Sequence, residues 1–262
     1  MKTIRITRHR YGVLPVEVPN DLPAVDTSLI DQVRPLIWHL IPKPLKVEIK
    51  SIGDRIGSLS RALHWNLHYE ILGGGCVAAA VPGNDGYVFH RRLEWDVGFT
   101  PAFRFVPLTP AGWVRYTPGF VGALSGCTPG WDIAMNASDF EPIDPLGVRG
   151  LPVAWVVREA IARGEDLEAT VRWLCKQRVM RDGFVTLVGP LEAYWLLLSQ
   201  DGGTTLLHKR YPRPLVVRNS MTEGTMDECG WAGASTAPYR AATADAWVLD
   251  QYLKPAGALS PA

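Results

Sequence analysis

The sequence lacks the features that mark several common classes of protein. No stretch reaches the roughly 18 consecutive apolar residues of a membrane span, although 47% of the residues are hydrophobic. The 27 Lys and Arg residues balance 26 Asp and Glu residues, and this net charge of +1 leaves no basic footprint for nucleic acid. No apolar run follows the basic first ten residues, so they do not form a secretory signal peptide.

Cysteine is scarce and scattered. The 4 Cys residues form no Cys-x-x-Cys pair and no Cys/His pattern typical of zinc. His64 and His68 lie four residues apart, as a metal-binding pair on a helix does, but no Glu follows His64 and no third ligand is evident. We therefore expect no disulfide framework, no metal and no organic cofactor, in a reduced, cytoplasmic protein.

Local patterns predict helices, then strands, two helices, more strands and a last helix. Apolar residues recur at helical spacing from Leu29 to Leu40, where Pro35 should bend or interrupt the helix, and a second helix is expected from Ile56 to Leu67. The later helices are expected at Val153–Arg163, Leu167–Gln177 and Pro238–Leu253. This order favours antiparallel sheets stacked between helical layers over a parallel βαβ fold.

Strands are predicted where short apolar runs are separated by Gly or Pro. The first two form a hairpin, and the strands that follow it are interpreted as a meandering antiparallel sheet. The predicted strands are Cys76–Val81, Tyr87–His90, Phe103–Pro107, Trp113–Tyr116, Phe120–Leu124, Asp132–Asn136, Phe184–Val188, Ala193–Ser199, Thr204–Lys209 and Pro214–Arg218.

Cys76 is the most informative position, because three glycines precede it and it opens the first predicted strand. Glycine permits the close backbone approach that a thiol needs to attack the preceding carbonyl. Attack on Gly75 would leave Cys76 as a new N-terminus, whose α-amine has a reference pKa of about 7.7–8 and can act as base for its own thiol. Two alternatives stay open: a small buried apolar Cys76, and a Cys76/His90 dyad across the hairpin.

Five segments resemble, in order, the motifs of one enzyme family. They are Asn66–Glu70, Gly86–Trp95, Pro118–Gly126, Gly150–Glu159 and Val216–Asn219. Their order and spacing are similar to those of the acid ceramidase and N-acylethanolamine acid amidase family. That family belongs to the choloylglycine-hydrolase-like group of N-terminal nucleophile (Ntn) hydrolases, and the resemblance runs from about residue 55 to about residue 245.

The resemblance implies an α+β fold, the αββα four-layer sandwich of Ntn hydrolases, with a helical N-terminal segment. Residues 1–75 would become a short chain after self-cleavage and residues 76–262 the catalytic chain, both parts of one domain. Cys76 would be the nucleophile. Asn219 would donate its side-chain amide to the oxyanion, and Arg240 would be a late active-site arginine.

The resemblance also assigns a charged pair to the second strand. Arg91 would pair with the substrate or hold the surroundings of the nucleophile, and Glu94 would stand where the family has Asp. An ungapped count selects Arg92 and Asp96 instead, and either pair could simply form surface ion pairs. In the same way, Asn219 could be an ordinary turn residue.

The implied function is hydrolysis of a linear carboxamide, a small-molecule N-acyl amide such as a fatty-acyl amide, with no nucleic-acid partner. An acyltransferase of the same fold is the alternative within enzymes. The alternative outside enzymes is a catalytically silent family member that binds an acyl ligand. It is considered because Val77, Arg92 and Glu94 replace family residues. The apolar stretch from Leu29 to Ile41 would suit an acyl pocket or peripheral lipid contact.

Overall fold

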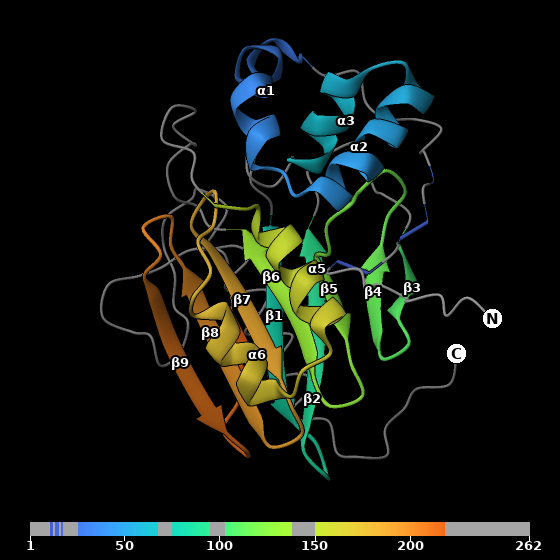
Figure 1. The fold of residues 1–262 in the computed structure, drawn as a ribbon. Helices are drawn as coiled ribbons and strands as arrows, with labels where there is room; N and C mark the ends of the chain where they lie inside the picture. Colours follow the sequence, from blue (N-terminus) through green and yellow to red (C-terminus); the bar gives the residue numbers. More distant parts are fainter. Residues whose placement is uncertain are drawn as a thin grey trace, which may run out of the picture.

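Proline, glycine and serine residues set where the N-terminal helices begin and end. The structure, a computed structural model, describes residues 11, 12, 14, 15, 17, 26–67, 75–94, 103–137 and 150–217 of the 262-residue chain. Its first helices are α1 (Ser28–Leu40), α2 (Lys43–Ile56) and α3 (Leu59–Asn66), which together form the helical segment (Figure 1). Gly57 ends α2 with a φ of 72°, and the Ser58 hydroxyl caps α3 by accepting the Arg61 N–H at 3.2 Å.

Helix α2 corrects the expected pattern, in which the second helix begins only at Ile56. Pro42 and Pro44 flank its first residue, where proline is tolerated because the first N–H groups of a helix have no partner within it. The apolar residues Leu45, Ile49 and Ile52 are buried at helical spacing. The prolines therefore start a helix here. Pro35, in turn, lies inside α1 with its side chain exposed, and α1 runs through it to Leu40.

In the described part of the chain, seven strands form the larger sheet, in sequence order and all antiparallel. They are β3 (Arg104–Thr109), β4 (Gly112–Tyr116), β5 (Ser125–Cys127), β6 (Asp132–Ala137), β7 (Gly183–Val188), β8 (Glu192–Leu198) and β9 (Thr204–Arg210). Every residue of β7 is buried. That pattern requires cover on both faces of the sheet.

The predicted hairpin belongs to a second sheet, apart from the meander of the strands that follow it. Strands β1 (Gly75–Pro82) and β2 (Tyr87–Glu94) pair with each other, and β10 (Leu215–Val217) pairs with the other edge of β1. The two sheets pack face to face through small residues of β1 and large ones of the larger sheet. Ala78 and Ala80 share a buried cluster with Phe184 and Trp195, whose stacked rings have centroids 5.3 Å apart.

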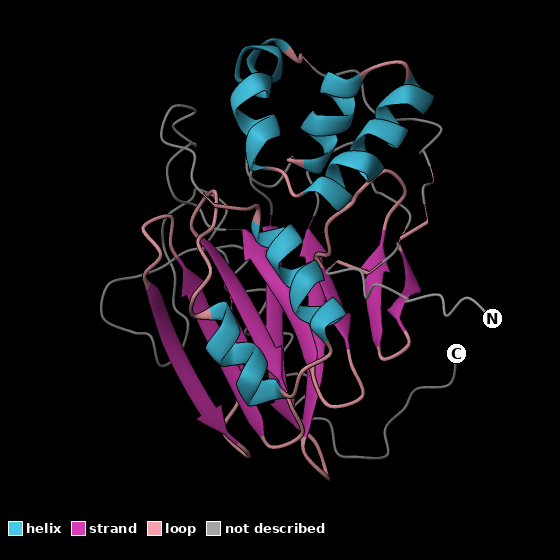
Figure 2. Ribbon diagram, viewed as in Figure 1, coloured by secondary structure: helices cyan, strands magenta, loops and turns pink. Residues whose placement is uncertain are grey.

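Two further helices cover the other face of the seven-stranded sheet (Figure 2). They are α5 (Val153–Arg163) and α6 (Leu167–Leu174), and their predicted end signals are confirmed. Gly164 ends α5 with a φ of 62°, and the Asp166 carboxylate accepts the Ala169 N–H at 2.7 Å. The described residues thus form an α+β protein with a layer of helices and two antiparallel sheets. The expected helix at Pro238–Leu253 lies outside them.

The segment Phe120–Leu124 is buried but is not the predicted strand. Its first backbone groups bond to side chains and to a helix, and a strand partner appears only at its end, where the Leu124 carbonyl accepts the Met135 N–H of β6 at 2.9 Å. The Val121 N–H donates to Asn66 Oδ1 at 2.6 Å, and the Ala123 N–H donates to the Ala154 carbonyl at 2.9 Å. A run of five mostly apolar residues does not indicate whether its backbone groups will bond to a strand or to side chains and a helix. Strand β5 therefore begins later than predicted, at Ser125.

Candidate active site

Cys76 lies at the end of the three-stranded sheet that faces the helical segment. It is the second residue of β1, and Gly75 pairs with Glu94 at the end of β2, whose arrowhead points toward the helices in Figure 1. The Cys76 side chain is 1% exposed and belongs to the same buried cluster as Leu63 and Trp65 of α3. The candidate nucleophile therefore lies below the helical segment.

The register of the hairpin decides which side chains share a face with Cys76. Ala78 pairs with Arg91, and Ala79 pairs with His90. Because side chains alternate along a strand, Cys76, Ala78 and Arg91 lie on one face and His90 on the other. The Cys76/His90 dyad is therefore not supported by this geometry. His90 is about half-buried, and burial lowers the pKa of its imidazole.

Asn136 of β6 connects Arg91 to the backbone of Cys76. Its side chain is fully buried, and its Oδ1 accepts a hydrogen bond from Arg91 Nη1 at 2.7 Å. Its Nδ2 donates to the carbonyl of Cys76 at 3.4 Å and to that of Val217 at 3.1 Å. Arg91 Nη2 also donates to the Met135 carbonyl. One amide thus joins β6 of the larger sheet to all three strands of the smaller one.

Asn136 is a site residue that sequence reasoning missed. The available signal is a single amide among the buried apolar residues Ile133, Ala134 and Met135 of the same strand. A buried amide needs hydrogen-bond partners, so its presence in such a strand indicates a polar contact across the sheets. Nothing in the local sequence says that the contacts are Arg91 and Cys76.

Several predicted site residues cannot be placed. Arg92 and Glu94 pair through their backbones with Val77 and Gly75, but their side chains lie outside the described part of the structure. The other positions outside the described residues are His68, Asp96, Asn219 and Arg240.

Three cysteine thiols in the described part of the chain are candidate nucleophiles. None of the three cysteines in the described part of the chain, Cys76, Cys127 and Cys175, belongs to a disulfide. Burial raises the pKa of the Cys127 and Cys175 thiols, and Asp132 adds to this effect at Cys127. A raised pKa lowers the thiolate fraction, and neither residue follows a glycine run. Among the three, Cys76 is the one that follows a run of glycines and shares a strand face with Arg91, and these two features make it the candidate nucleophile.

A search of the described residues finds no cluster of three or more His, Cys, Asp or Glu side chains that could hold a metal ion. Within that same part of the chain, none of the helices has both the length and the apolar character needed to cross a membrane.

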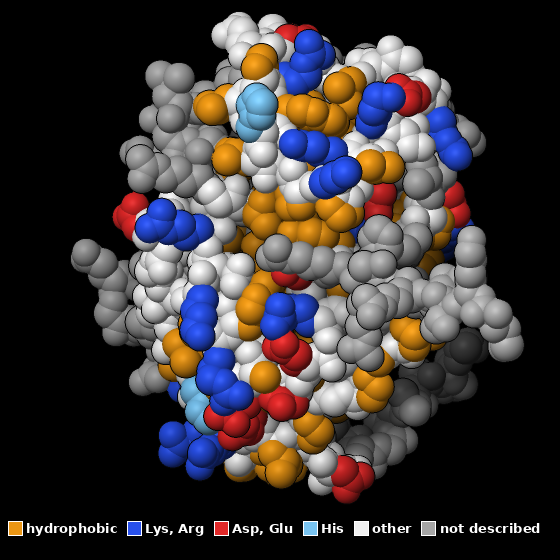
Figure 3. Space-filling model, in the orientation of Figure 1, with side chains coloured by type: hydrophobic (Ala, Val, Ile, Leu, Met, Phe, Trp, Pro, Cys, Tyr) orange, Lys and Arg blue, Asp and Glu red, His pale blue; other side chains and the backbone are white. Residues whose placement is uncertain are grey.

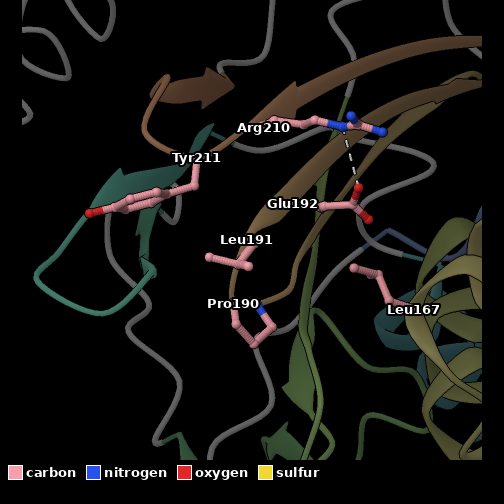
Figure 4. Close-up of a pocket in the computed structure, with 6 residues that line it drawn as sticks. All are labelled: Leu167, Pro190, Leu191, Glu192, Arg210 and Tyr211. Atoms are coloured by element: carbon pink, nitrogen blue, oxygen red, sulfur yellow. Dashed lines mark ion pairs between the residues drawn. The ribbon is translucent and has the colours of Figure 1, made fainter.

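A separate hollow of about 670 Å³ lies at the far end of the sheets (Figure 4). Its lining includes the ion pair between Arg210 Nε and Glu192, 3.6 Å apart, and the side chain of Tyr211. Tyr211 Oη donates to the carbonyl of Gly83, just beyond the end of β1. The strand from Cys76 to Pro82 spans roughly 20 Å, so this hollow is remote from the candidate nucleophile.

Curated proteins with similar sequences are amidases. The chain is 23% identical over 193 residues to the N-acylethanolamine-hydrolyzing acid amidase of Mus musculus. This match covers 67% of this chain and 52% of the mouse protein. The chain is 25% identical to the enzymes of Rattus norvegicus and Oryctolagus cuniculus, over 67% of this chain and 52% and 53% of those proteins. No protein-family model matches the chain.

The chain spans about half the length of the curated relatives it matches. These matches, which agree with the resemblance of the five motif segments, show that the protein is a distant relative of the N-acylethanolamine-hydrolyzing acid amidases.

Proposed function

We propose that the protein is an amidohydrolase that cleaves a linear N-acyl amide with Cys76 as its nucleophile. The observation that carries this proposal is the placement of Cys76 at the start of β1, with its carbonyl and the Arg91 guanidinium both bonded to Asn136. The relatives named as amidases support the reaction class.

The first proposed step is self-cleavage. The Cys76 thiol attacks the Gly75 carbonyl, the Gly75–Cys76 amide bond breaks, and the acyl group passes to sulfur while the nitrogen takes up the thiol proton. Water then hydrolyses this thioester, which leaves a Gly75 carboxylate and a free Cys76 amine and thiol. Asn136 fixes the Cys76 carbonyl, so it would hold the residue in one orientation during this step.

The second proposed step is amide hydrolysis. The Cys76 amine takes the proton of its own thiol, whose sulfur attacks the substrate carbonyl, and the substrate amine leaves with a proton. Water releases the acid from the acyl-thioester and restores the thiol. An amine with a reference pKa of about 7.7–8 can act as this base near neutral pH.

We propose Asn219 as the donor to the oxyanion of both tetrahedral intermediates. The β1–β10 register supports this choice, because Ala78 pairs with Val217 in antiparallel strands. Cys76 is two residues before Ala78 in sequence, and Asn219 is two residues after Val217, the last residue of β10.

We propose Arg91 as a positioning residue, because it holds Asn136 and shares the face of Cys76. Glu94 and Arg240 stay proposed site residues on the family resemblance alone. Arg92 and Asp96 are the alternative to Arg91 and Glu94.

The experiment is a hydrolysis assay with a series of N-acyl amides, in which the acyl chain and the amine half are varied separately. Wild-type protein should release free acid and amine, and Cys76→Ala should release neither. Adding a second amine tests the acyltransferase alternative, since a transferase forms a new amide faster than free acid. Binding of the amides without turnover would instead support a silent acyl-ligand-binding protein.

We propose peripheral lipid contact through the outer face of α2. Val47 is 63% exposed between the exposed residues Lys43 and Lys50, one turn away on either side. Figure 3 shows hydrophobic patches among Lys and Arg side chains on this end of the molecule. Such a face suits anionic lipid, and Val47→Glu should reduce co-sedimentation with phosphatidylserine vesicles. A cytoplasmic location stays a prediction from the sequence.

A further inference from the structure

The hollow of about 670 Å³ at the far end of the sheets has the size and the lining of a small-molecule site. Such sites enclose roughly 300–1,000 Å³ and combine mostly apolar walls with a few placed polar groups. Two charged residues line this hollow, Glu192 and Arg210, one of each sign. The apolar wall comes from the start of α6, the β7–β8 turn and the residue after β9, namely Leu167, Pro190, Leu191 and Tyr211.

The apolar wall has a fixed backbone and an open surface. The Tyr87 N–H donates to the Pro190 carbonyl at 2.8 Å, and the Tyr211 N–H donates to the Leu191 carbonyl at 2.9 Å. The Tyr211 hydroxyl donates to the Gly83 carbonyl at 2.7 Å. The Leu191 side chain is nevertheless 58% exposed. This wall therefore suits a ligand with an apolar body, which would shield Leu191 from water.

Glu192 is held in one orientation by two stacked rings. Tyr194 Oη donates to Glu192 Oε2 at 3.0 Å, and His208 Nε2 is 3.5 Å from Glu192 Oε1. The centroids of the Tyr194 and His208 rings are 4.3 Å apart. Burial raises the pKa of Tyr194 to about 12, and the bond to Glu192 and its charge add to this effect, so the hydroxyl keeps the proton that it donates. The Glu192 carboxylate is thus preorganised beside the hollow.

Arg210 is held much more loosely than Glu192. Its Nε is 3.6 Å from Glu192 Oε1, and its side chain is 78% exposed. Within the described part of the chain, neither Nη atom of Arg210 makes a hydrogen bond. An exposed ion pair of this kind contributes little by itself, whereas a guanidinium binds a carboxylate through two parallel hydrogen bonds. In the view of Figure 4 the Glu192 carboxylate lies between the Arg210 guanidinium and Leu167.

We infer that this hollow is a binding site for a free α-amino acid with an apolar side chain. The ligand's carboxylate binds the Nη groups of Arg210, its ammonium donates to Glu192, and its side chain lies on Leu191. An α-amino acid carries both charges on one carbon, so they match two side-chain charges that lie side by side. A carboxylate without an amine fits less well, because Glu192 repels it. The site is independent of the proposed amide hydrolysis and of self-cleavage.

The test adds L-leucine to the full chain and follows the backbone amide signals by NMR. The amides of Leu191, Glu192 and Tyr211 report on the hollow. Three analogues separate the parts of the ligand. Isocaproate lacks the ammonium, isoamylamine lacks the carboxylate, and glycine lacks the apolar side chain.

The variants are Arg210→Gln and Glu192→Gln, the second of which keeps an acceptor for the Tyr194 hydroxyl. Arg172→Gln is the matched control, because Arg172 forms an exposed ion pair with Glu168 and does not line the hollow. Cys76→Ala is a second control, because the hollow is remote from Cys76. It shows whether leucine binds at the candidate active site instead.

Leucine should give saturable shifts at the amides of the hollow in wild type and in both controls. Arg210→Gln and Glu192→Gln should each weaken its binding at least about tenfold, because each removes a charge-assisted hydrogen bond. Each of the three analogues should also bind at least about tenfold more weakly than leucine.

Several results would overturn the inference. One is the absence of saturable shifts with leucine up to about 20 mM. Equal binding of leucine and either isocaproate or isoamylamine would leave a site for a single charge. Unchanged binding in either variant, or lost binding in Cys76→Ala, would place leucine elsewhere. Shifts that follow protein concentration instead of leucine would assign the hollow to a second copy of the chain.

Discussion

The Asn136 side chain accepts a hydrogen bond from Arg91 Nη1 at 2.7 Å and at the same time donates to the carbonyl of Cys76. This single amide relates a charged side chain of β2 to the backbone of the candidate nucleophile in β1. Because the amide is fully buried, its three contacts are not exchanged with water. The arrangement makes Asn136 the residue whose replacement should disturb Cys76 and Arg91 together.

Replacing Asn136 with Asp should destabilise the fold. The carboxylate keeps an acceptor for Arg91 but loses the donors to the Cys76 and Val217 carbonyls, and it places a negative charge beside both. We expect a loss of about 2 kcal/mol or more in the free energy of unfolding, measured with urea. Asn84→Asp, in the exposed turn of the hairpin, is the matched control and should change little. Equal stability of both variants would show that the buried contacts of Asn136 are weak.

Replacing Arg91 with Lys should reduce activity more than it reduces stability. Lysine keeps the charge, but it lacks the planar fork with which Arg91 reaches Asn136 and the Met135 carbonyl. We expect kcat/KM for an N-acyl amide to fall about 10- to 100-fold. Arg172→Lys is the control, because Arg172 forms an exposed ion pair with Glu168. If Arg91→Lys is as active as wild type, Arg92 becomes the stronger candidate.

His90→Ala should leave amide hydrolysis within about threefold of wild type. The reason is the register, which puts His90 and Cys76 on opposite faces of the hairpin. Initial rates at saturating substrate measure this directly, alongside Cys76→Ala as the inactive reference. A 100-fold loss in His90→Ala, in a protein that melts at the wild-type temperature, would restore the Cys76/His90 dyad.

Acid should destabilise the helical segment through His64 of α3. Burial lowers the pKa of His64 below its usual value of 6.5, although Asp26 partly offsets the shift. The unfolded chain then binds a proton at a higher pH than the folded one. The stability contributed by neutral His64 is therefore complete above pH 6.5 and is lost as the pH falls through 6.5 toward the lower folded value.

Urea midpoints between pH 7.5 and pH 5 test this expectation. His64→Gln should decline less steeply with acid than wild type. Some decline should persist, because burial shifts the pKa of His90 in the same direction. Parallel pH profiles for wild type and His64→Gln would mean that His64 is not the group responsible. His39→Gln, at an exposed position of α1, is the control.

Local chemistry predicted the parts of the fold that local signals control. Gly164 and Asp166 end one helix and begin the next as expected, because capping depends on neighbours within a few residues. The place of β10 in the smaller sheet was not predictable in the same way. It depends on β10 pairing with β1, which lies more than a hundred residues earlier in the chain.

The residues of the candidate site also differ in whether a local sequence signal identifies them. Cys76 can be singled out from the three glycines before it, and Arg91 from a resemblance of its strand. Asn136 could not be found, because its partners lie 45, 60 and 81 residues away in sequence and none leaves a local signal. Phe120–Leu124 was predicted as a strand for a related reason. The backbone partners of its Val121 are the side chains of Asn66 and of Arg158 in α5, which are distant in sequence.

The most direct test of the account is the intact mass of freshly purified protein, wild type beside Cys76→Ala. If Cys76 is a nucleophile that frees its own amine, wild type should give two pieces that meet between Gly75 and Cys76, and Cys76→Ala should give one full-length chain. A single uncleaved chain from both proteins, at mildly acidic and at neutral pH, would contradict it.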